Sequence, residues 1–154
     1  MFRKLALVAS GFAAGVLMTV TTLGVGVRPA GADQAEHAYL LAQKAQVAGT
    51  TFQLDRSAFH EIAVAATQGR IASGALGVVR PARIAAQATE WPEALKPIAA
   101  GLVTDLQALE EAIQTEDPSK VAEPAKKVHD VGHDLSVAVY TWLGGGQPAG
   151  ASGH

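Results

Sequence analysis

Residues 121–143 read VAEPAKKVHDVGHDLSVAVYTWL and carry the clearest structural signal in the chain. An apolar seam recurs there every seven residues: Val121, Val128, Leu135 and Trp142, with Ala125, Gly132 and Val139 between them. This spacing predicts a helix that lies nearly antiparallel against its neighbours in a bundle. Asp117 and Pro118 precede the seam and predict the N-cap and the first turn of this helix.

Upstream, helical periodicity predicts a helix over residues 33–48. Gly49 either ends or bends this helix, or the helix continues unbroken into the next one. Asp55 is the expected N-cap of a second helix, which closes at Gly69. The sequence therefore predicts two helices, or one interrupted helix, before residue 70.

A third helical segment begins at residues 73–74 and contains Pro81, which predicts a kink or two short helices. Trp91 and Pro92 mark a corner before a fourth helix, which runs through Thr115 with one apolar face. No segment of convincing length has the alternation of a strand. The predicted fold class is all-α: a four-helix-bundle-like, up-and-down domain over residues 33–143 with one extra or broken helix.

Residues 1–32 have the pattern of a secretory signal peptide. Arg3 and Lys4 precede 23 residues without charge, and small residues at 30–32 form a cleavage pattern before Asp33. An uncleaved membrane anchor is the alternative, because the charge-free stretch is long enough to span the hydrocarbon. Both versions predict an extracytoplasmic domain, either periplasmic, secreted or anchored facing outward. Residues 144–154 are rich in Gly, Pro and Ser and are predicted to be a disordered tail.

The composition excludes several classes of partner and ligand. Without the predicted signal peptide, nine basic residues remain against 14 acidic ones. A negative domain without a basic stripe argues against nucleic acid and against an anionic membrane surface, so membrane contact is expected only through an uncleaved N-terminal segment. There is no cysteine, and Met1 and Met18 both lie in the predicted signal peptide. Thiolate and thioether ligands are thus excluded, which argues against Cu(I).

Histidines provide the most specific functional signal. His129 and His133 are four residues apart, so both imidazoles lie on one side of one helix. Helical metal sites use this spacing, because two nitrogens must converge on an ion at about 2 Å. His60 on the second helix is expected opposite this pair, as in metal sites built inside bundles. The candidates that would complete the ligand set are His37, Glu61 and Asp130.

The candidate ions without sulfur ligands are Zn(II), Cu(II), Ni(II) and iron. Haem held by two histidines is a weaker candidate, since His37 is poorly placed as an axial ligand. Two other interpretations stay open: the pair is a solvent-exposed feature without a ligand, or the imidazoles join helices through hydrogen bonds. Gly132 lies between the two histidines and costs the helix about 1 kcal/mol relative to alanine. It predicts the close approach of another helix or of a ligand.

The sequence contains no Gly-rich phosphate loop, nucleophile elbow or zinc-protease motif, so we expect no enzyme. The predicted function is that of an exported, non-enzymatic bundle that binds a metal ion and stores, buffers or delivers it. The alternative is a structural or partner-binding accessory module of an envelope assembly, with an unspecified protein partner and no metal site.

Overall fold

The computed structural model describes residues 30–146. Its helices are α1 (Ala30–Asp55), α2 (Phe59–Thr67), α3 (Ala75–Ala88), the short 3-10 helix η1 (Glu93–Leu95), α4 (Lys96–Gln114) and α5 (Pro118–Leu143). Most of the predicted signal peptide and of the predicted disordered tail lies outside the described residues. No helix within residues 30–146 has an apolar stretch of the length needed to cross a membrane.

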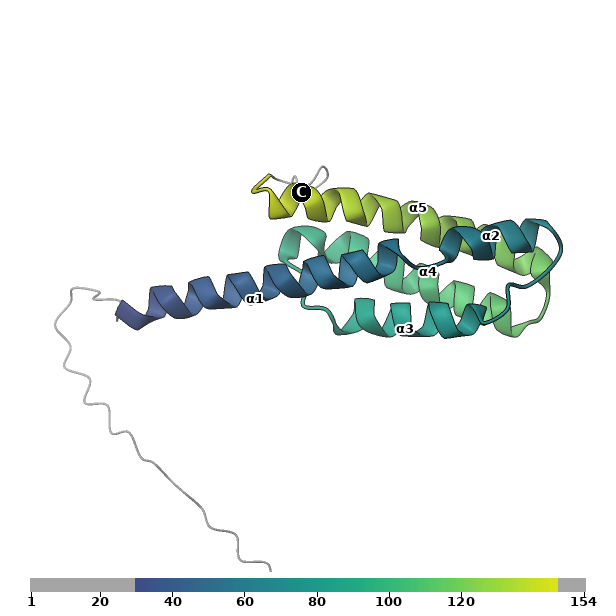
Figure 1. Cartoon of the computed structure of the whole chain (residues 1–154), viewed down its shortest axis with the longest axis horizontal. Helices are drawn as coiled ribbons and strands as arrows, with labels where there is room; N and C mark the ends of the chain where they lie inside the picture. The colour runs from purple at the N-terminus through teal and green to yellow at the C-terminus, as the bar shows by residue number, and fades with distance from the viewer. Residues whose placement is uncertain (1–29, 147–154) are drawn as a thin grey trace, which may run out of the picture.

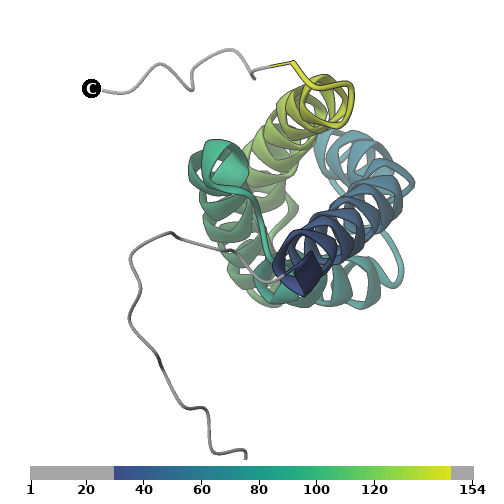
Figure 2. The same ribbon diagram turned by 90° about the vertical axis from the view of Figure 1, so that its left-hand side faces the viewer.

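The helices form an up-and-down bundle (Figure 1). α1 and α2 follow one another in the same direction, and α3, α4 and α5 then alternate in direction beside them. Seen end-on, the helices surround a shared core (Figure 2). The prediction of an all-α, four-helix-bundle-like fold with one broken helix is therefore confirmed, and α1 and α2 are the two parts of the broken helix.

The core is organised around α5, which packs against α2, α4 and α1, while α3 packs on α4. Val121, Val128 and Leu135 of the predicted seam are at most 1% exposed. Burying each such side chain contributes about 1.5–3 kcal/mol to the free energy of unfolding. The last seam residue, Trp142, is half-buried, and the ammonium of Lys44 on α1 lies 5.7 Å from the centre of its ring.

The first helix continues past Gly49 to Asp55, so the unbroken alternative is the correct one at Gly49. The interruption lies instead at residues 56–58, between α1 and α2. The prediction that Asp55 caps the second helix is wrong, because α2 begins after Ala58 without a side-chain cap. The physical reason is that Asp55 is the last residue of α1 and lies three residues before Ala58, the N-cap of α2; its carboxylate accepts a hydrogen bond from Ser136 on α5 instead.

α3 remains a single helix through Pro81, so the predicted division into two short helices is wrong, and the kink at Pro81 stays a prediction. Val79 and Ala82 on either side of the proline are buried and hold the helix against the core. The proline ring is exposed, and so is Gly77, one turn earlier. In a regular helix the Gly77 carbonyl would accept a hydrogen bond from the amide of residue 81, but proline has no amide hydrogen to donate. Water can satisfy that carbonyl, so the helix continues.

Helices α3 and α4 are joined by a carboxylate that two guanidinium groups share. Arg80 Nε lies 2.8 Å from Glu110 Oε1, and Arg83 Nε lies 3.0 Å from Glu110 Oε2. The hydrogen bond from Arg80, followed by that from Arg83, holds the pKa of the Glu110 carboxyl below its ordinary value. The ionised form of Glu110 is therefore stabilised by folding.

This lowered pKa makes a pH-dependent contribution to stability. The contribution is fully present above the carboxyl pKa of the unfolded chain and is lost as the pH falls through the lower pKa of the folded state. We expect Glu110→Gln to be less stable than the wild type at pH 7 and the two proteins to converge below about pH 4. Chemical denaturation at a series of pH values measures the difference.

Glu111→Gln is the matched control, because the exposed Glu111 only accepts a hydrogen bond from Gln107 on its own helix. It should follow the wild type across the pH range. A stability difference between Glu110→Gln and the wild type that did not change with pH would contradict the prediction.

Candidate metal centre

Three of the predicted ligands lie next to one another across the contact between α2 and α5. The ring centroids of His60 and His129 are 5.6 Å apart, and those of His129 and His133 are 6.0 Å apart. His60 stands in the first turn of α2, and the other two stand one turn apart on α5. The three imidazoles therefore form a row with His129 in the middle.

The row lies at the surface of the bundle. His129 is half-buried, whereas His60 and His133 are exposed. Two imidazoles that share a tetrahedral ion have ring centroids roughly 5 Å apart, given a Zn–N distance of about 2.0–2.1 Å. Within residues 30–146, no group of three or more His, Asp or Glu side chains could hold an ion as it stands. A metal site here therefore needs side-chain rotation, which the exposed rings permit.

The other predicted ligands are placed less favourably. His37 stands in the exposed first half of α1, 18 residues before Asp55, which is about 27 Å along the helix axis at 1.5 Å per residue. That half of α1 extends beyond the bundle, so the structure does not bring His37 to the other histidines (Figure 1). Glu61 is exposed on α2. Asp130 is exposed and accepts a hydrogen bond from Lys126, which holds the pKa of this carboxyl below its ordinary value.

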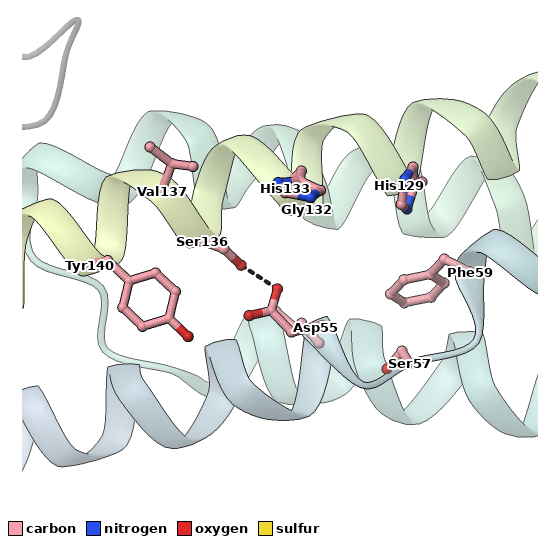
Figure 3. A pocket seen from close by; sticks show the side chains of 10 residues that line it. Asp55, Ser57, Phe59, His129, Gly132, His133, Ser136, Val137 and Tyr140 are labelled. Atoms are coloured by element: carbon pink, nitrogen blue, oxygen red, sulfur yellow. Dashed lines mark hydrogen bonds between the residues drawn. The ribbon is translucent and has the colours of Figure 1, made fainter.

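A hollow of about 360 Å³ opens where the chain is interrupted between α1 and α2, opposite α5 (Figure 3). We call it the α1–α5 hollow. One wall is a stripe of α5 side chains, and the other is the end of α1 and the interruption. The polar groups that line it are those of Asp55, Ser57, His129, His133, Ser136 and Tyr140.

Asp55 carries the only carboxylate among the residues that line the α1–α5 hollow, beside the imidazoles of His129 and His133. Ser136 donates its hydroxyl hydrogen bond to Asp55 across the hollow, as Figure 3 shows. No lysine or arginine lines it. The hollow can therefore accept a cation without placing it beside a fixed positive charge.

Gly132 faces this hollow from α5. A Cβ atom built at Gly132 would meet no atom within 4 Å, so the predicted close approach of another helix is wrong. The interruption at residues 56–58 explains this, because no regular helical turn lies opposite the glycine.

A second hollow of about 550 Å³ lies on the other side of His129, between α2 and α5. We call it the α2–α5 hollow. It is lined by His60 and His129, by the carboxylates Glu123 and Asp130, and also by Lys126, Thr67 and apolar side chains. His129 thus borders both hollows, and Glu61 borders neither.

The sequence predicts Asp55 as a helix cap within reach of the histidines, but does not include it in the ligand set. Its contact with Ser136 joins residues 81 positions apart, and local periodicity carries no signal for such a contact. A comparison of the chain with protein-family models, with curated proteins and with solved structures found no match.

The open space at Gly132 leads to a stability prediction. Gly132→Ala should raise the free energy of unfolding by about 1 kcal/mol, because alanine favours a helix interior and the added methyl group clashes with nothing. Thermal or chemical denaturation measures the change.

Gly101→Ala on α4 is the control, because Gly101 also lies inside a helix with no atom within 4 Å of an added Cβ atom; Gly101 is exposed, whereas Gly132 is half-buried. Both substitutions should stabilise the protein to a similar extent. A loss of stability at position 132 alone would show that the space is filled in the folded protein.

Proposed function

We propose that this protein is an exported, non-enzymatic helical bundle that binds a divalent metal ion through histidines on α2 and α5 and stores, buffers or delivers that ion. The observation that supports the proposal most is the row formed by His60, His129 and His133. Neighbouring rings in it are 5.6 and 6.0 Å apart.

The chemistry of the row favours an exchangeable ion. Neutral imidazole nitrogens suit Zn(II), Cu(II), Ni(II) and iron, and residues 33–154 hold no sulfur ligand for Cu(I). An ion held by two imidazoles keeps coordination positions for water, unlike the closed four-ligand sites that stabilise folds. Because the outer rings are exposed, the ion can enter and leave without unfolding. These properties fit buffering or delivery.

Charge and targeting support the same proposal. The chain beyond the predicted signal peptide has nine basic and 14 acidic residues, and a negative protein raises the local concentration of cations. The charge-free stretch after Arg3 and Lys4 supports export.

Protein recovered from its host should then begin at Asp33, which mass spectrometry of the intact chain measures. Recovery of the full-length chain in the membrane fraction would replace cleavage with anchoring.

The metal proposal is tested by calorimetric titration of the mature protein, prepared without an affinity tag, with Zn(II) and with Cu(II). We expect the wild type to bind one ion and the double variant His129→Ala, His133→Ala to bind at least about tenfold more weakly, because both nitrogens of the α5 pair are lost.

His37→Ala is the matched control, since it removes an exposed histidine far from the row. It should bind like the wild type. Equal binding by the wild type and by the double variant would remove the proposal.

The exposed first half of α1 favours a second candidate function. Tyr39, Leu40 and Leu41 are 50%, 43% and 55% exposed on α1, although the Tyr39 hydroxyl donates a hydrogen bond to Glu90 of the bundle. Apolar side chains in this position suit a contact with a protein partner, as expected of an accessory module of an envelope assembly. The titration separates the two candidates: no binding by the wild type would leave the accessory module as the function supported.

A further inference from the structure

We infer that the ion binds in the α1–α5 hollow and that Asp55 provides a third, anionic ligand beside His129 and His133. This inference rests on the proposed function and keeps its two α5 histidines, but it leaves His60 of α2, which lines only the α2–α5 hollow, outside the ligand set. It replaces the carboxylates expected from the sequence, Glu61 and Asp130, with one from a different helix.

The hydrogen bond between Asp55 and Ser136 brings the carboxylate close to the histidine pair. Ser136 follows His133 by three residues on α5, and side chains at this spacing have Cβ atoms about 5–6 Å apart. Asp55 therefore lies beside the face of α5 that carries His133. Figure 3 shows Asp55 reaching from the end of α1 toward the α5 stripe. His129 is half-buried, whereas Asp55 and His133 are exposed, and a shared ion requires these side chains to rotate.

Charge favours Asp55 over Asp130 as the anionic ligand. Two neutral imidazoles leave the charge of a divalent ion uncompensated, so a carboxylate adds affinity. Asp130 is engaged by Lys126, and the ammonium group would stay beside an ion bound in the α2–α5 hollow. Within residues 30–146, no lysine or arginine forms an ion pair with Asp55.

Arg56, the basic residue next to Asp55, does not occupy the position proposed for the ion. The guanidinium of Arg56 lies over the ring of Phe52, 5.3 Å from its centre, and Arg56 does not line the α1–α5 hollow. The hollow thus combines two imidazoles, one carboxylate and no cation.

Ser136 holds the Asp55 carboxylate when no ion is bound and releases it to the ion. Two nitrogens and one carboxylate oxygen leave open positions for water and form a ligand set typical of Zn(II) and of non-haem iron(II). Ser136 is therefore a positioning residue. When the ion binds, it replaces the Ser136 hydroxyl as the partner of the Asp55 carboxylate.

Zn(II) titration of the full mature protein tests the inference with three single variants. Asp55→Asn should weaken binding about tenfold or more, because the amide keeps the shape and the hydrogen bond of the carboxylate but loses its charge. Ser136→Ala should bind as well as the wild type or more tightly, because the carboxylate is then free for the ion. Asp130→Asn should bind like the wild type. Circular dichroism and denaturation midpoints confirm that each variant is folded.

Each departure from this pattern overturns the inference. Equal affinity of Asp55→Asn and the wild type would exclude Asp55 as a ligand. An equal loss in Asp55→Asn and Ser136→Ala would assign a structural role to the pair. A loss in Asp130→Asn with none in Asp55→Asn would place the ion in the α2–α5 hollow.

The double variant His129→Ala, His133→Ala separates this inference from the proposed function. If that variant binds like the wild type, the proposed function fails. If it loses the ion while Asp55→Asn keeps it, the inference about Asp55 fails alone.

Discussion

The burial of the α5 seam against α2 and α4 is the constraint on which the rest of the structure depends. Val128 and Leu135 are almost fully buried, and they fix the rotation of α5 about its own axis. Once that rotation is fixed, the adjacent stripe that carries His129 and His133 must lie at the edge of the core. The positions of the imidazoles thus follow from the packing of apolar side chains next to them, and the same packing brings α2 and its His60 alongside.

The interruption between α1 and α2 supplies what the seam alone does not. A continuous helix over residues 56–58 would carry regular side chains against α5 and fill the space there. The chain instead leaves the helical path after Asp55 and returns to it at Phe59. Gly132 on α5 adds no side chain from the opposite wall. The α1–α5 hollow therefore results from an interrupted helix and a glycine that face each other.

The features that the sequence predicted correctly depend mainly on residues that lie close together in the chain. α5 was predicted with its N-cap and its end, because Asp117 accepts a hydrogen bond from the Ser119 amide two residues later and the seam is a local repeat. The bundle fold followed from the same periodicity. The pairing of His129 with His133 was equally local, whereas the approach of His60 depended on which helices are neighbours. Asp55 has the sequence signature of a helix cap, and only the distant hydroxyl of Ser136 assigns it another role.

The open space beside Gly132 affects which substitutions the protein can accept during evolution. A residue between two metal-ligand candidates normally has its size dictated by packing, but here a larger side chain would meet no neighbouring atom at its first carbon. A glutamate or histidine introduced by mutation would carry a new donor atom into the hollow while the apolar seam kept its shape. If the proposed site holds an ion, one codon would then change its coordination number and ion preference, separately from the mutations that decide whether the bundle folds.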